Sequence, residues 1–387
     1  MGGALIPFSS TTVTLPSRAR KILFWSHLVA GIASGLVILV MASTGILLSF
    51  ERQIIEAADG YEAASQAPRL PLRELHEKLK STEPGARPTG MALRSDPSAP
   101  VAFQFGPDKT VYVDPGTGVV LGEASTRIRA FFRTVTEIHR WLALKGQPRE
   151  IARSITAAAV LVFLFIIVSG ILLWIPKRWT RKGLRSIAVP NPRLKGRARD
   201  WNWHHALGIW SALPLLVMVS TGLIIAYPWA NHLLFSAVGE KLPERKGGKR
   251  QRGPGPTEGP ESISLRLDQA VASAGEISPD WTQMQFSFPE GSEVTLFVSD
   301  SHRGRPDLRR EITIDLPSGS VTETKDFSDR TKGQRLRTWV RWIHTGEAGG
   351  WVGQLVAALA SGAAVLLIGT GFALSFRRFF RKRSAAN

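Results

Sequence analysis

Four histidines precede four apolar stretches of the sequence, and their type and placement suit metal chemistry. They are His27, His139, His204 and His344. A neutral imidazole is a common metal ligand, and two imidazoles that face each other between helices can supply both axial bonds to a haem iron. We therefore expect these four histidines to be axial ligands of haem iron, with His205 as an alternative to its neighbour His204.

Equal intervals along the chain indicate how the histidines pair. His27 lies 18 residues before Gly45, and His204 lies 18 residues before Gly222. At a rise of about 1.5 Å per residue, each interval spans about 27 Å, which is close to the thickness of the hydrocarbon layer. His27 and His204 are thus expected at one depth, near one membrane face. The other two histidines precede runs of the opposite direction and are expected near the other face, so that the two pairs hold two haem b groups.

Other metal chemistry fits these residues less well. The chain has no cysteine, which excludes a CxxCH haem attachment, a cysteine-ligated iron–sulfur cluster and a thiolate zinc site. A catalytic zinc site requires clustered ligands such as HExxH, and no such motif occurs. Met41 and Met218 are alternative axial ligands by type, although both lie in the middle of apolar runs.

Membrane-spanning helices are the elements that must position the histidines. A span needs about 20 apolar residues, and four runs without Asp, Glu, Lys or Arg are long enough: Leu28–Phe50, Ile155–Ile175, Leu207–Trp229 and Trp351–Phe376. Each run has glycine beside serine or threonine near one end, and such small residues let helices approach closely. The expected fold class is an integral membrane α-helical protein with four transmembrane helices and two extracytoplasmic α+β domains.

The net charge of +18 is concentrated beside these runs. Nine Lys and Arg residues and no acidic residue lie in 177–199, and further basic residues flank the first run and follow the last. This distribution is the positive-inside pattern of a membrane protein, and it argues against a nucleic-acid partner. We therefore expect a bacterial inner-membrane protein, embedded in the lipid bilayer, with both termini in the cytoplasm and its soluble domains in the periplasm.

The two polar stretches between the spans have similar patterns, which indicates two related halves. Each has a helical pattern, short strands and a turn containing Asp, Pro and Gly. The expected strands are Val101–Phe105, Thr110–Val113, Val119–Leu121, Thr282–Phe288, Glu293–Val298 and Glu311–Ile314. Residues 240–261, rich in Gly, Pro and basic residues, are expected to form a loop.

These patterns divide the chain into seven segments. They are residues 1–50 (cytoplasmic N-terminus and first span), 51–138 (first periplasmic domain), 139–176 (His motif and second span), 177–203 (basic cytoplasmic loop), 204–229 (His motif and third span), 230–343 (second periplasmic domain) and 344–387 (His motif, fourth span and basic C-terminus).

Four motifs carry a resemblance to a known family. They are Tyr112-Val113-Asp114-Pro115, Ile138-His139-Arg140-Trp141-Leu142, His204-His205-Ala206-Leu207-Gly208 and Ile343-His344-Thr345-Gly346-Glu347. With them the chain resembles the PepSY-associated transmembrane family, and within it the FoxB-type siderophore reductases. The resemblance implies PepSY-like domains outside the membrane, haem within it, and reduction of ferric siderophores with release of ferrous iron. It places the four histidines at the family's histidine positions.

The chain departs from the family pattern at two places. His205 stands where the family usually has arginine, so either His204 or His205 could be the inner ligand. The arginine–aromatic pair that usually follows the first histidine is replaced by Leu28-Val29.

The resulting hypothesis is a haem-dependent ferric-siderophore reductase that takes electrons from a cytoplasmic donor or from quinol. No GxGxxG motif follows a strand, so we expect no built-in nicotinamide site. No catalytic residue beyond the iron ligands is assigned. Two alternatives remain open, namely a non-enzymatic PepSY scaffold or inhibitor with membrane anchors, and a haem protein that donates electrons to a partner oxidoreductase.

Overall fold

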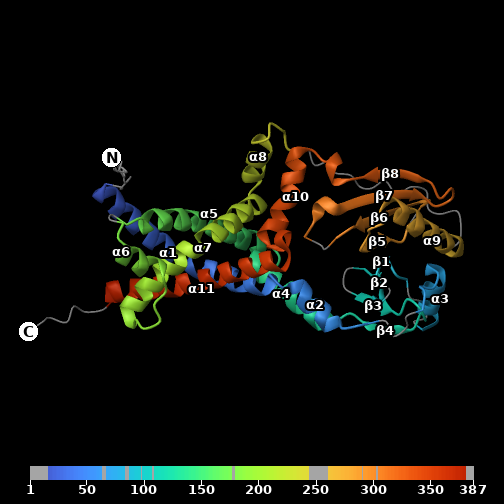
Figure 1. The fold of residues 1–387 in the computed structure, drawn as a ribbon, viewed down its shortest axis with the longest axis horizontal. Coiled ribbons are helices and arrows are strands. Elements are labelled where there is room, and N and C mark those ends of the chain that lie inside the picture. Colours follow the sequence, from blue (N-terminus) through green and yellow to red (C-terminus); the bar gives the residue numbers. More distant parts are fainter. Residues whose placement is uncertain are drawn as a thin grey trace, which may run out of the picture. The chain divides into compact units, whose positions relative to one another are not determined.

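The computed structural model describes residues 16–62, 67–82, 87–96, 98–106, 109–176, 179–243, 260–289, 291–301 and 304–380. The chain forms two compact units (Figure 1). The first comprises Met1–Ser49, Val135–Ala226 and Leu355–Asn387, and the second comprises Phe50–Thr134 and Tyr227–Gln354. Most of the loop expected at 240–261 lies outside the described residues.

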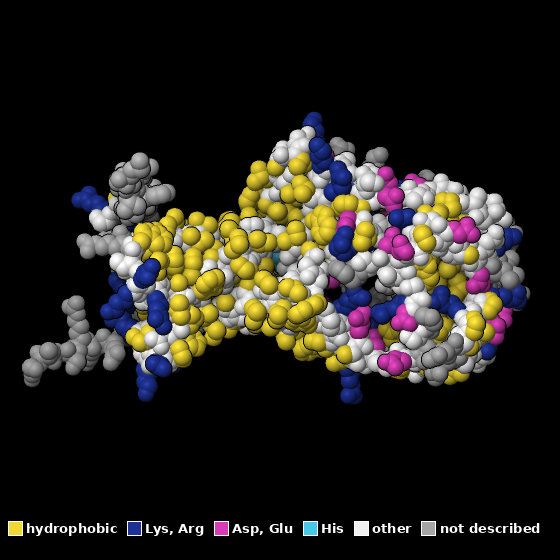
Figure 2. Space-filling model, in the orientation of Figure 1, with side chains coloured by type: hydrophobic (Ala, Val, Ile, Leu, Met, Phe, Trp, Pro, Cys, Tyr) yellow, Lys and Arg dark blue, Asp and Glu magenta, His cyan; other side chains and the backbone are white. Residues whose placement is uncertain are grey.

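Four long apolar helices dominate the first unit: α1 (Ser17–Leu48), α5 (Pro148–Trp174), α7 (Gly196–Ala226) and α11 (Gly350–Phe380). Each is long and apolar enough to cross a membrane, and only 22–33% of its most apolar window is buried within the protein. Large apolar side chains such as Leu36, Trp210 and Leu213 point outward and are about 70% exposed. Apolar side chains cover these helices in Figure 2. Such a surface requires lipid, so the four predicted spans are confirmed.

Small residues allow the helices of this unit to pack closely. A Cβ atom at Gly35 of α1 would lie 2.7 Å from the ring of Phe372 on α11, so a larger residue there would have to displace that ring. A buried cluster on α5, α7 and α11, including Ile167, Leu215 and Ala364, forms the interior. The short helix α6 (Arg181–Ala188) begins where the Thr180 hydroxyl accepts a hydrogen bond from the Gly183 amide.

The second unit is built on one eight-stranded antiparallel sheet with the strand order β4-β3-β2-β1-β5-β6-β7-β8. The strands are β1 (Gly90–Arg94), β2 (Val101–Phe105), β3 (Lys109–Val113), β4 (Val120–Glu123), β5 (Gln283–Ser287), β6 (Glu293–Ser299), β7 (Arg309–Asp315) and β8 (Val321–Lys325). The strands expected in two separate domains therefore form a single sheet. The order is mirrored about the β1–β5 pair, as expected for two related halves.

Pairing of β1 with β5 joins the two halves and their cores. Met91 lies opposite Phe286 and Leu93 opposite Met284, and all four side chains are buried. The pairing removes one exposed strand edge from each half. The helices α3 (Leu72–Thr82) and α9 (Pro260–Ile277) pack together and bury apolar side chains in the same core. Asp268 of α9 accepts a hydrogen bond from the Leu72 amide, so one half caps the helix of the other.

Short helices link the sheet and the spans: α2 (Glu51–Asp59), α4 (Thr126–Trp141), α8 (Pro228–Ser236) and α10 (Lys332–His344). The helix α10 begins with a capping box in which the side chains of Thr331 and Gln334 bond each other's backbone amides. His139 and His344 thus lie near the C-terminal ends of separate short helices, each just before a span. Three single-turn helices, η1 (Pro306–Leu308), η2 (Phe327–Asp329) and η3 (Glu347–Gly349), complete the described elements.

Candidate functional site

Three of the four candidate histidines share one arrangement. In each, the ring Nδ1 is hydrogen-bonded to a serine or threonine hydroxyl of a neighbouring helix. The pairs are His27 with Ser169 at 2.8 Å, His139 with Thr44 at 3.0 Å and His204 with Thr370 at 3.0 Å.

The hydroxyl groups determine which ring nitrogen carries the proton. The Thr370 hydroxyl donates its hydrogen to the Leu366 carbonyl at 2.8 Å, so it can only accept from the histidine. The corresponding hydroxyls likewise donate to carbonyls one helical turn earlier. At His139 the Met41 carbonyl, 3.0 Å away, also requires a donor at Nδ1. We therefore assign the proton to Nδ1 in all three rings, which leaves the Nε2 lone pair free to bind a metal.

A glycine follows each supporting hydroxyl and leaves room for the ring. An added Cβ atom would lie 3.4 Å from His27 Cε1 at Gly170, 3.5 Å from His204 Cε1 at Gly371 and 3.7 Å from His139 Cε1 at Gly45. A methyl group at these positions would just reach van der Waals contact with the imidazole, and a side chain larger than alanine would crowd it. The Ser/Thr-Gly pairs, which the sequence interpretation assigned to helix packing alone, therefore also support the histidines.

His27 and His204, the two histidines expected at one depth, come from α1 and α7. Their hydroxyl partners lie on α5 and α11. His205 is held differently, because its Nδ1 bonds the Trp201 carbonyl of its own helix at 2.8 Å and its ring packs on Trp201, with ring centroids 4.2 Å apart. Only His204 of the two has the hydroxyl partner on another helix, so the geometry favours His204 over His205 as the ligand.

The helices α1 and α7 have the same spacing between a histidine and a threonine. Thr44 follows His27 by 17 residues, and Thr221 follows His204 by 17 residues. The hydroxyls of both threonines donate to carbonyls of their own helix. A rise of about 1.5 Å per residue separates the two levels by roughly 26 Å. His139, bonded to Thr44, therefore lies near the opposite end of the bundle from His27. His344 belongs to the second unit, so its pairing with His139 stays a prediction.

Left-handed turns follow both short helices that carry histidines. Leu142 and Ala143, just after His139, have φ values of 52° and 60°, which strain residues with a side chain. Gly346, just after His344, has a φ of 78°, and a Cβ atom there would lie 2.4 Å from the Gly353 carbonyl oxygen. These turns change the chain direction immediately after each ligand candidate.

The donor groups of the first unit fit a haem better than a bare ion. No cluster of three or more His, Asp or Glu side chains occurs among the described residues. Two imidazoles suffice for haem, because the porphyrin supplies the other four nitrogen ligands. There is open space beside Gly31, since nothing lies within 4 Å of a Cβ atom placed there. A hydrogen-bond donor is also present, because the buried Trp203 indole N–H has no partner among the described residues.

A comparison with protein families identifies the family of the chain. The family model of the PepSY-associated TM region matches residues 24–378, which is most of the chain. The chain belongs to this family. No curated protein matches the sequence.

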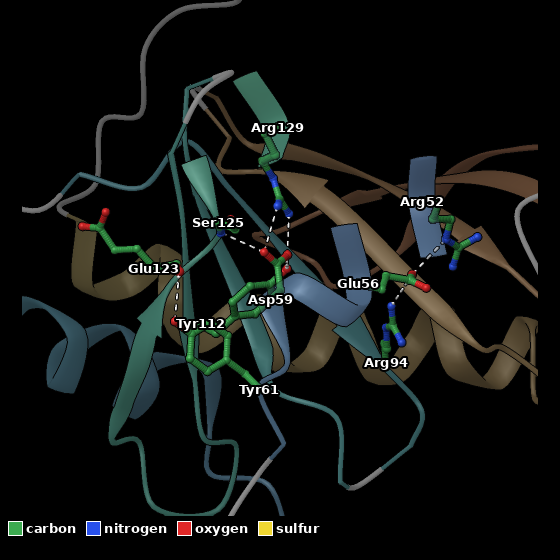
Figure 3. A network of polar contacts seen from close by, with 9 residues as sticks. All are labelled: Arg52, Glu56, Asp59, Tyr61, Arg94, Tyr112, Glu123, Ser125 and Arg129. Carbon is green, nitrogen blue, oxygen red and sulfur yellow. Dashed lines mark hydrogen bonds and ion pairs between the residues drawn. The ribbon is translucent and has the colours of Figure 1, made fainter. Parts of the chain in front are cut away.

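In this PepSY-associated protein, a buried ion pair attaches the start of α4 to the sheet of the second unit (Figure 3). Asp59, whose side chain is 6% exposed, accepts hydrogen bonds from Arg129, the Ser125 amide and Tyr112. Burial alone would raise the pKa of Asp59, but these hydrogen bonds outweigh it and hold the pKa below its ordinary value. Burial and the same carboxylate raise the pKa of Tyr112 to about 12.

Proposed function

We propose that the protein is a di-haem inner-membrane reductase that moves electrons from the cytoplasmic side to a ferric siderophore in the periplasm. The observation that carries this proposal is the set of imidazoles whose Nδ1 atoms are held by hydroxyls of neighbouring helices, which presents Nε2 for iron. In this assignment His27 and His204 would hold one haem and His139 and His344 the other.

A bound haem supplies a one-electron redox centre, and the chain's own residues set its position and surroundings. Ser169 and Thr370 fix the orientation of His27 and His204, and they increase the basicity of the ligating nitrogens through the Nδ1 hydrogen bonds. The apolar helices around them exclude water from the interior.

The charge distribution supports the proposed direction of transfer. The His27 and His204 pair lies at the basic end of the helices, where Arg378 contacts the Trp25 ring at 4.8 Å and Arg377 pairs with Asp200. Basic ends face the cytoplasm in most inner-membrane proteins. Electrons would therefore enter at this pair, from a cytoplasmic donor or from quinol, and leave at the periplasmic side.

Each ferric ion takes one electron and becomes ferrous. Ferrous iron binds the hard oxygen ligands of a siderophore more weakly, so reduction releases it. The donor loses one electron for each ferrous ion released, and the siderophore leaves without its metal.

The visible spectrum of the purified full-length protein tests the cofactor, and its reoxidation tests the substrate. We expect a Soret band, split α and β bands on reduction, two haems per chain, and reoxidation of the reduced protein by a ferric siderophore. A His139→Ala, His344→Ala double variant should retain one haem. A colourless protein from haem-replete cells would refute the proposal and favour a scaffold. Haem that ferric siderophores do not reoxidise would favour an electron donor to a partner protein.

A further inference from the structure

The two short helices α4 and α10 correspond to each other, but they differ at one buried position. Aligned on His139 and His344, they place valines at 135 and 340, and both valines are 5% exposed. Seven residues before each histidine stand Phe132 in α4 and Arg337 in α10. Phe132 is 1% exposed, so this position faces the interior in the first half.

Arg337 places a cation at this inward-facing position without a counter-charge. Its side chain is half-buried and makes no hydrogen bond or ion pair with any described residue. Burial lowers the pKa of its guanidinium. Two partly buried arginines of the same unit are paired with carboxylates, Arg129 with Asp59 and Arg310 with Asp300. A half-buried and unpaired guanidinium is costly, which indicates a site where an anion from solution completes the pairing.

A second arginine extends this cationic surface toward the histidine. Arg341 lies one helical turn after Arg337 on the same side of α10, and it has no carboxylate partner among the residues described. Its guanidinium lies 5.3 Å from the ring of Trp342, and that of Arg309 lies 4.7 Å from the same ring. His344 follows Arg337 by seven residues, so all three side chains share one side of the helix.

We propose that Arg337 and Arg341 form an anion subsite that binds a carboxylate group of the ferric chelate beside the outer histidine. This proposal rests on the proposed reductase function and narrows its substrate class to chelates with net negative charge. Guanidinium groups bind carboxylates by charge-assisted and often bidentate hydrogen bonds. The first half cannot offer such a subsite, because Phe132 fills the corresponding position.

Binding of redox-inert chelates tests the subsite separately from reduction. The probes are the singly negative gallium–EDTA complex and the singly positive gallium–desferrioxamine B complex, titrated into the haem-loaded full-length protein. One charge-assisted hydrogen bond corresponds to roughly tenfold in affinity. We expect Arg337→Gln to weaken gallium–EDTA binding about tenfold. Adding Arg341→Gln to this variant should weaken the binding further. Binding of the cationic complex should change little in either variant. High salt should reduce the difference between the variants.

Two further variants separate the charge from the fold. Arg335→Gln removes a cation from another side of α10 and should bind both probes as the original protein does. Arg337→Phe introduces the residue of the first half, so it should pack well and still lose gallium–EDTA affinity. Equal weakening of both probes, or none, would overturn the proposal. Loss of haem from Arg337→Gln would also overturn it, because the arginines would then bind the carboxylates of the cofactor. Arginine-dependent binding of gallium–EDTA, with no reoxidation of the reduced haem by ferric EDTA or by ferric siderophores, would retain the subsite and refute the reductase function.

Discussion

The hydrogen bond from His204 to Thr370 makes a quantitative prediction. Thr370→Val keeps the shape of the side chain but removes the acceptor, 3.0 Å from Nδ1. Without that bond the imidazole is a weaker base and stabilises ferric iron less, so the midpoint potential should rise. One hydrogen bond contributes about 0.5–1.5 kcal/mol, and a tenfold change in the equilibrium corresponds to about 59 mV for one electron, so we expect a rise of about 20–60 mV. The Leu367 backbone also bonds His204, which favours the lower part of this range.

A spectroelectrochemical titration of the purified protein measures this shift. Only the haem step assigned to His204 should move, because the proposed second haem would be held by different residues. Ser375→Ala is the matched control, since its hydroxyl bonds the Gly371 carbonyl of its own helix in the same way but supports no histidine. An unchanged or lowered potential in Thr370→Val, or the same shift in both haem steps, would refute the assigned tautomer and the role of the hydroxyl.

Three further predictions follow from single contacts. His204→Ala should reduce the haem content from two to one per chain, whereas His205→Ala should retain two, as measured by pyridine haemochrome; the reverse result would make His205 the ligand. The depressed pKa of Asp59 means that its stabilisation is present above about pH 4, its unfolded value, and is lost as the pH falls through the folded value. Acid-induced proteolysis of the second unit should therefore depend less on pH in Asp59→Asn, and an unchanged profile would contradict this. Among the described residues, Arg377→Gln leaves Asp200, with a side chain 3% exposed, paired only with Arg199. It should lower the free energy of unfolding by about 1–3 kcal/mol, seen as a lower melting temperature in detergent, and an unchanged melting temperature would show that Arg199 suffices.

The membrane helices could be predicted because their signal is local. Four charge-free apolar runs of sufficient length have few alternatives. The structure extends them at their polar ends and ends three of them slightly earlier than expected, at Leu48, Trp174 and Ala226. The helices α4 and α10 were expected only as histidine motifs. Both are amphipathic and short, and α10 is defined by its capping box rather than by apolar length. Tertiary packing decides such helices more than the local sequence does.

The single sheet could not be predicted from either half alone. Six strands were expected at nearly the observed positions because their buried residues alternate. The strand β1 was missed because it begins with Gly90, a residue that is unfavourable in strands, although a Cβ atom there would approach the Phe286 carbonyl oxygen to 2.7 Å. The strand β8 is exposed along its whole length and has no apolar alternation. The β1–β5 pairing joins segments about 190 residues apart, which local patterns do not specify.

Side-chain roles were harder to predict than elements. The Ser/Thr-Gly pairs were recognised, but their hydrogen bonds to histidine depend on how neighbouring helices are rotated, which the sequence does not reveal. His76 belongs to a polar helix, and nothing in the sequence marks its contacts. Its ring packs against Phe103 and Phe288, with centroids 6.3 Å and 5.3 Å away, and its buried Nε2 has no partner among the described residues.

The two halves are alike where the same chemistry is needed twice and differ where it is needed once. In the proposed reductase a haem iron on either side of the membrane would need the same imidazole. The helix α1 carries both His27, the proposed inner ligand, and Thr44, which bonds His139. A tilt of α1 would therefore move His27 and Thr44 together, which restricts the helix arrangements that preserve both histidine sites. A substrate that arrives from one side needs recognition on one side only. The corresponding positions of the two halves, the buried Phe132 and the unpaired Arg337, show a difference of that kind. Arg337 belongs to the helix beside which the chelate would bind.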